Sequence, residues 1–147
     1  MELSTSLSAA LEESSTLLNQ ARSYLHSGRE GSDYRESVEY SIGALFSLAH
    51  ALHKVHGHLL GNPDRKYSNK GWSILDQFFA DGLGSDPDSL AKVRRLLDLV
   101  ANHTRPSWNL DKRAVGRTDA AIVVEATTSI LNIAARVIGL DWERNAS

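Results

Sequence analysis

Apolar residues recur at intervals of three and four along most of the chain, which is the spacing of amphipathic helices rather than of strands. The first helical stretch extends to Gly28. The second begins near Asp33, which lies three residues before Glu36 as in a capping box, and ends at the Gly-Asn-Pro turn of residues 61–63. At about 25 residues, this second stretch is the longest helix that we expect.

Three further helices follow. Aromatic residues at 72–79 predict a short third helix that ends in a Gly-Leu-Gly turn. Asp86 followed by Pro87 is typical of a helix N-terminus and predicts the start of a fourth. The fifth is expected to begin with Thr118 as its N-cap and to close at Gly139. Short connections favour antiparallel neighbours, so the chain is expected to be all-α: a single domain over residues 1–147, an antiparallel bundle of about five helices.

Composition supports one folded domain, because 41% of the residues are hydrophobic and 23% are charged. The chain has no cysteine, which excludes disulfides, thiolate zinc sites and cysteine nucleophiles. A reducing, cytoplasmic location is therefore expected. Neither a signal peptide nor an apolar stretch close to the length of a membrane span is evident, so we expect no membrane contact.

The net charge of −2 hides an asymmetry along the chain. Residues 1–45 contain three arginines and seven carboxylates, whereas residues 92–117 contain seven basic residues and only two acidic ones. Such a basic segment attracts phosphates through its local field, although an ordinary solvated helix face followed by a loop gives the same pattern. Its 103–117 part is a long connection, and long loops in compact domains often carry function.

Four of the six histidines lie close together, at positions 50, 53, 56 and 58. At about 100° per residue only neighbouring pairs share a helix face, and no carboxylate lies within the cluster to complete a metal site. We therefore expect no metal and no other cofactor. Histidines in the last turns of a helix are explained by the helix dipole and by partial burial. The motifs of P-loop, dinucleotide-binding and serine-hydrolase enzymes are absent from the sequence.

The stretch LLDLVANHTRPSW at residues 96–108 lies between a long helix rich in small residues and a final amphipathic helix. This arrangement resembles the HEPN family of prokaryotic helical domains, which often carry an R-N-x-x-x-H type junction. The resemblance implies a bundle of four or five helices that forms a homodimer. It also implies a place in toxin–antitoxin, abortive-infection or CRISPR systems, where many members are metal-independent ribonucleases.

In this chain Asn102 matches the motif asparagine, but Ala101 stands in the arginine position and Pro106 or Ser107 in the histidine position. The resemblance therefore implies a non-catalytic binding or regulatory module in a defence or toxin–antitoxin setting. One alternative is an atypical ribonuclease that uses His103 and Arg105, helped by Arg95 or Asn102, across a dimer.

A second alternative is a small helical RNA-binding subunit of a ribonucleoprotein complex, because phosphate contacts require only basic side chains. A tryptophan in the basic segment has the chemistry to stack on a base, although it also suits a core position. The candidate contacts to RNA or a cognate protein partner are Arg94, Arg95, Asn102, Trp108, Lys112, Arg113 and Arg117.

Overall fold

The computed structural model describes residues 2–29, 31–56, 70–104 and 116–146, with side chains for 7–29, 33–54, 71–102 and 116–139. Within these residues the chain forms five α-helices and no strand, as the sequence predicts. The helices are α1 (Glu2–Ser27), α2 (Gly31–His56), α3 (Lys70–Gly82), α4 (Pro87–Thr104) and α5 (Arg117–Ala146).

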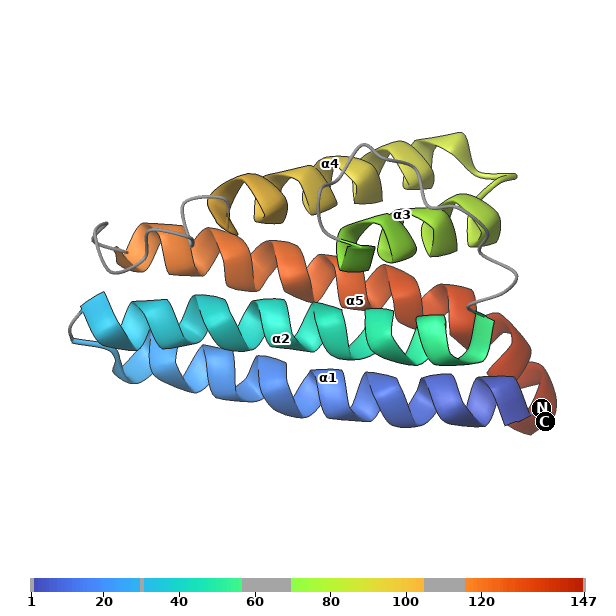
Figure 1. Cartoon of the computed structure of the whole chain (residues 1–147), viewed down its shortest axis with the longest axis horizontal. Helices are drawn as coiled ribbons and strands as arrows, with labels where there is room; N and C mark the ends of the chain where they lie inside the picture. Colours follow the sequence, from blue (N-terminus) through green and yellow to red (C-terminus); the bar gives the residue numbers. More distant parts are fainter. Residues whose placement is uncertain (1, 30, 57–69, 105–115, 147) are drawn as a thin grey trace.

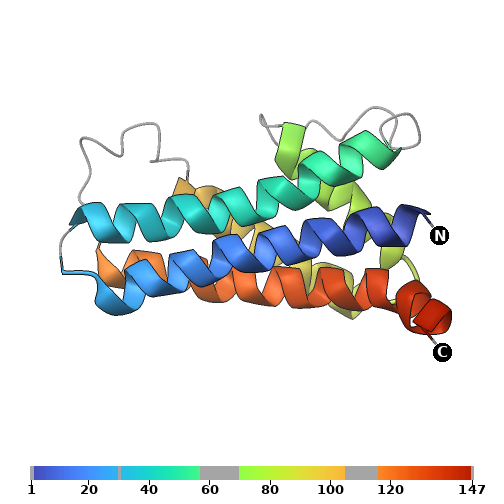
Figure 2. The same ribbon diagram turned by 90° about the horizontal axis from the view of Figure 1, so that it is seen from below.

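The helices α1 and α2 form a long antiparallel hairpin, and α5 lies between this hairpin and the α3–α4 pair (Figure 1). Seen from below, α1 covers the seam between α2 and α5 (Figure 2). α3 runs beside the second half of α2 and antiparallel to α4 (Figure 1). α5 contacts each of the other four helices, so it is the central element of the bundle.

One hydrophobic core joins all five helices. Leucines of α2 fill its centre together with Phe79 of α3 and β-branched residues of α4 and α5, because the apolar stripe of each helix faces the same interior. Side chains in this centre with no exposed surface include Leu45, Leu48, Leu75, Phe79, Val93, Leu97, Val100, Val123 and Ile130. The predicted all-α bundle is therefore confirmed.

The two helices of the hairpin are tied by buried serines. Ser14 of α1 donates its hydroxyl hydrogen to the carbonyl of Ala44 in α2, and Ser37 of α2 donates to the carbonyl of Ala21 in α1, each over 2.7 Å. A hydroxyl on Cβ reaches the backbone of a neighbouring helix only when the two helices lie close together. Small residues at this interface allow that approach, and each hydroxyl finds a partner away from water.

Two of the predicted N-caps were wrong. α2 begins at Gly31, so Asp33 lies inside its first turn, where its carboxylate accepts the backbone N–H of Arg29 over 3.1 Å. α5 begins at Arg117, and its N-cap is Gly116 rather than Thr118. The carboxylate of Asp119 accepts the N–H of Gly116 over 3.2 Å. In both helices an aspartate reaches back from the first turn instead of standing before it.

The prediction for α5 was also wrong in length. This helix continues past Gly139 and has 30 residues, more than the 26 of α2. A glycine weakens a helix without stopping it, since its backbone still adopts helical angles. The segment Arg117–Gly139 is long and apolar enough to cross a membrane, contrary to expectation, and half of its most apolar window is buried in the bundle. Core helices share these properties, so the expected lack of membrane contact stays a prediction.

Candidate binding surface

The outward face of α4 carries a mixed basic and apolar stripe formed by Lys92, Arg95, Leu99 and Asn102, called here the α4 stripe. These positions follow one another at intervals of three, four and three, so they lie on one side of the helix. All four are exposed. Leu99 is 38% exposed and is the one large hydrophobic residue found exposed among the described side chains. The stripe thus offers two cations beside an apolar contact point.

Arg94 points to a different side of α4 from its neighbour Arg95. Its Nε lies 3.0 Å from Oδ1 of Asp76 in α3, and its Nη2 lies 3.4 Å from Oδ2. The Asp76 side chain is only 8% exposed, whereas that of Arg94 is 41% exposed. The guanidinium compensates a carboxylate that is held away from water, and the pair joins α3 to α4. Arg94 therefore has a packing role that the sequence did not indicate.

The other predicted site residues differ in how much of each one the structure describes. Arg117 is exposed at the start of α5, and Asn102 is exposed near the end of α4. The start of α5 and the end of α4 lie at the same end of the bundle (Figure 1). The backbone of His103 belongs to the last turn of α4, but its side chain lies outside the described residues. Four more candidates lie wholly outside them, namely Arg105, Trp108, Lys112 and Arg113. The proposed catalytic pair of His103 and Arg105 therefore stays a prediction.

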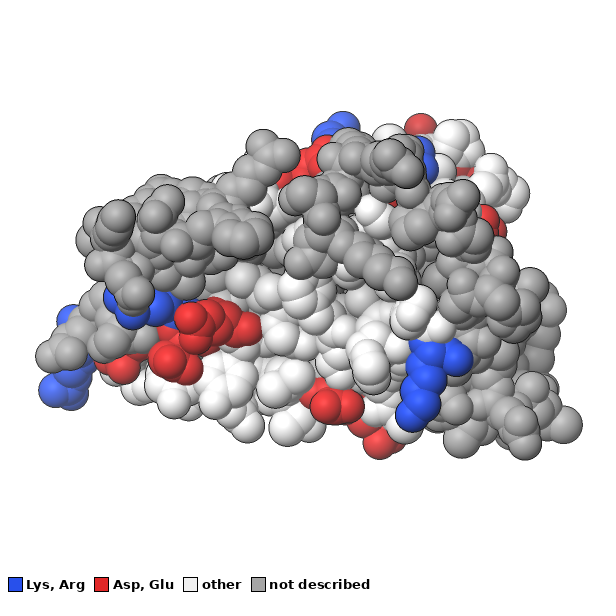
Figure 3. Space-filling model, viewed as in Figure 1, with Lys and Arg blue, Asp and Glu red and all other residues white. Residues whose placement is uncertain are grey.

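The histidine cluster gives no metal site in the described part of the chain. His50 and His53 are exposed on α2, and no group of three histidine, aspartate or glutamate side chains comes together there. The side chains of His56 and His58 lie outside the described residues. On the face seen in Figure 3, an uncharged area lies between acidic side chains on the left and basic side chains on the right.

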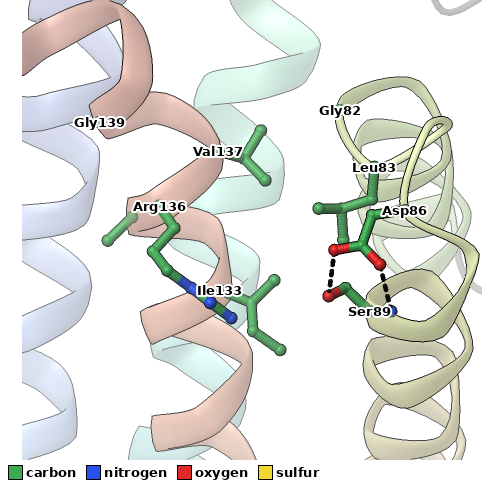
Figure 4. A pocket seen from close by; sticks show the side chains of 9 residues that line it. Gly82, Leu83, Asp86, Ser89, Ile133, Arg136, Val137 and Gly139 are labelled. Atoms are coloured by element: carbon green, nitrogen blue, oxygen red, sulfur yellow. Dashed lines mark hydrogen bonds between the residues drawn. The ribbon is translucent and has the colours of Figure 1, made fainter.

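A groove of about 590 Å³ lies between the α3–α4 turn and the C-terminal half of α5, and is called here the α3–α5 groove. Its lining includes Leu83, Asp86 and Ser89 on one wall and Ile133 and Arg136 on the other (Figure 4). Sequence reasoning missed this site because the two walls are about 50 residues apart in the chain and share no local motif.

Asp86 is the N-cap of α4, as predicted. One of its carboxylate oxygens accepts the hydroxyl hydrogen of Ser89 over 2.7 Å, and the other accepts the backbone N–H of Ser89 over 3.2 Å. These two bonds, the hydroxyl first, hold the pKa of Asp86 below its ordinary value, and Arg136 across the groove acts in the same direction. The Asp86 carboxylate therefore stays negatively charged to lower pH than an ordinary aspartate.

Comparison with family models, with curated proteins and with solved structures gave no match. The function is therefore inferred from the side chains of this chain.

Proposed function

We propose that the protein is a non-catalytic helical-bundle binding module of HEPN type that contacts RNA through the α4 stripe and the basic segment of residues 92–117. The setting proposed for it, from the family resemblance, is prokaryotic defence or a toxin–antitoxin pair. It works in the cytoplasm as a homodimer in this proposal.

The observation that carries the proposal is the α4 stripe. Two exposed cations, Lys92 and Arg95, stand one turn apart on the same face, and neither side chain has an acidic partner among the described residues. Such cations neutralise the phosphates of a nucleic acid, and this contact needs no catalytic group. Asn102 adds an exposed amide that donates and accepts hydrogen bonds, and Leu99 adds an apolar surface for a base or sugar.

The proposal of a non-catalytic role rests on the junction sequence. Metal-independent cleavage of RNA needs a group that moves the 2′-hydroxyl proton and a cation that stabilises the phosphorane charge. At the positions where the family has these groups, this chain has Ala101 and either Pro106 or Ser107. Binding without cleavage therefore fits the residues better than a ribonuclease does.

The test is fluorescence anisotropy with a labelled single-stranded RNA over a range of salt concentrations. The double variant Lys92→Gln/Arg95→Gln should lower the slope of log K against log salt by about 1.4, roughly 0.7 for each phosphate that the protein no longer neutralises. The matched control is Arg29→Gln/Lys54→Gln, which removes the same charge from two exposed positions outside the 92–117 segment. An equal loss in both variants would mean that only net charge matters.

The same preparations separate the remaining alternatives. Cleavage of the RNA by the wild type, lost in His103→Ala and in Arg105→Ala, would replace the binding module with the atypical ribonuclease. A lack of RNA retention even at low salt would remove RNA as the ligand and leave a cognate protein as the partner.

A further inference from the structure

The α3–α5 groove has the size and lining of a small-ligand site. Its volume of about 590 Å³ lies within the range of roughly 300–1,000 Å³ that is usual for such sites. Most of the lining is apolar, from Leu83 in the α3–α4 turn and from Ile133 and Val137 on α5 (Figure 4). Ligand sites commonly combine such an apolar lining with a few polar groups that fix orientation.

The polar groups of the groove have opposite charges on opposite walls. Arg136 extends beside Ile133 on the α5 wall, and Asp86 lies with Ser89 on the facing wall (Figure 4). The carboxylate of Asp86 is fixed by its two bonds to Ser89. Among the described residues the Arg136 guanidinium forms no hydrogen bond and no ion pair, and it interacts electrostatically with Asp86 across the groove.

Two glycines line the groove for different reasons. A Cβ at Gly82 would come within 2.5 Å of Cγ1 of Val137, so close packing between α3 and α5 explains this glycine. A Cβ at Gly139 would meet no atom of the described residues within 4 Å. Glycine weakens the interior of a helix relative to alanine, and no described neighbour requires it at this position. The lack of a side chain at Gly139 leaves this part of the groove open.

We propose that the α3–α5 groove binds a short hydrophobic peptide in its zwitterionic form. Its terminal carboxylate pairs with Arg136, its ammonium group pairs with Asp86, and its apolar side chains rest on Leu83, Ile133 and Val137.

The charge arrangement selects this ligand over simpler ones. An apolar anion paired with Arg136 brings its charge toward Asp86, and an apolar cation paired with Asp86 brings its charge toward Arg136. Only a ligand with both charges satisfies both walls. The groove shares no residue with the α4 stripe, whose nearest member, Lys92, lies about 9 Å from Asp86 along α4 at a rise of 1.5 Å per residue.

The probe is the dipeptide Leu-Leu, titrated into the labelled full chain and followed by amide chemical shifts in NMR spectra. Shifts are expected at Leu83, Ser89, Ile133 and Val137. N-acetyl-Leu-Leu, which lacks the ammonium group, and Leu-Leu-amide, which lacks the carboxylate, should each bind at least about tenfold more weakly, since each forms only one of the two charge pairs. If N-acetyl-Leu-Leu bound as tightly as Leu-Leu, the proposal of a zwitterionic ligand would be overturned, and the groove would be a site for apolar anions.

Three variants assign the contacts. Arg136→Gln should weaken Leu-Leu to the level of Leu-Leu-amide without changing the affinity for the amide itself. Asp86→Asn should weaken the binding of Leu-Leu to the level of N-acetyl-Leu-Leu without changing the affinity for the acetylated peptide. Asparagine still caps α4, so the fold is kept. Gly139→Leu should fill the groove and abolish the shifts.

The matched controls are Arg29→Gln, an exposed arginine far from the groove in sequence, and Gly139→Ala, which gains helix propensity with little filling. Both should bind like the wild type. No shift with millimolar Leu-Leu, or an equal loss in Arg29→Gln and Arg136→Gln, would overturn the proposal.

Discussion

The α1–α2 hairpin and the α3–α4 pair solve the same packing problem with different chemistry. In the hairpin, the buried polar groups are serine hydroxyls that bond to the backbone of the facing helix, as Ser14 does to Ala44. In the α3–α4 pair, two charged side chains, Asp76 and Arg94, bond to each other across the interface. The hairpin therefore depends on close approach of two backbones, whereas the α3–α4 pair is joined by two longer side chains that reach each other.

This difference bears on where ligands are expected. The serine hydroxyls of the hairpin are satisfied within the interface and are not available to a ligand. The α3–α4 side carries the exposed cations of the α4 stripe, and its turn forms one wall of the α3–α5 groove. Both binding features described above therefore include residues of the α3–α4 side of the bundle.

The close approach of the hairpin is tested most strongly by Ser14→Leu. Leucine adds three carbon atoms at a fully buried position and removes the bond to Ala44, so unfolding free energy should fall by about 1–3 kcal/mol. Urea denaturation measures this loss. The control is Ser15→Leu at the next, exposed position, which should change stability by no more than about 0.5 kcal/mol. Equal losses at the two positions would mean that the helices are not in close contact at Ser14.

The bridge between α3 and α4 is tested by Arg94→Gln. Because it leaves the Asp76 carboxylate held away from water without its cation, stability should fall by about 1–2 kcal/mol, between the values for exposed and buried pairs. Arg95→Gln is the control and should be nearly neutral for stability. The order should reverse for RNA, where Arg95→Gln weakens binding more than Arg94→Gln does. If the same variant has the larger effect on both stability and RNA binding, the division of roles between these arginines is wrong.

These two arginines illustrate what the sequence can predict. The apolar spacing gives the helices and the shared interior, because burial of a stripe depends on intervals along one helix. It also identifies 92–117 as basic. It does not separate Arg94 from Arg95, because the partner of Arg94 is 18 positions away on another helix. The α3–α5 groove was beyond prediction for the same reason.

The caps show a second limit. The sequence correctly marks Asp86 as an N-cap, since Pro87 fits the first helical position. Asp33 and Asp119 use the same carboxylate chemistry from inside the first turn, so the cap falls on an earlier residue. An aspartate near a helix start is compatible with both positions. Only the backbone conformation of the preceding residues distinguishes them.

The smallest effect expected is the pH dependence that Asp86 confers on the α3–α4 side. Its pKa is lower in the folded chain than in the unfolded chain, where it is about 3.9, so its stabilising contribution is present above that value and is lost as the pH falls through the folded pKa. Asp86→Asn keeps the cap but cannot titrate, so its Tm should lie close to that of the wild type at pH 7.

Thermal unfolding followed by circular dichroism from pH 7 to pH 3 measures the difference. The wild type should lose stability relative to Asp86→Asn below about pH 4, because only the wild type has this carboxylate to protonate. Asp86→Ala, which lacks a cap, should melt about 4 °C below the wild type at pH 7. If the Tm values of the wild type and of Asp86→Asn differ by the same amount at every pH, Ser89 does not hold this carboxylate in its charged form.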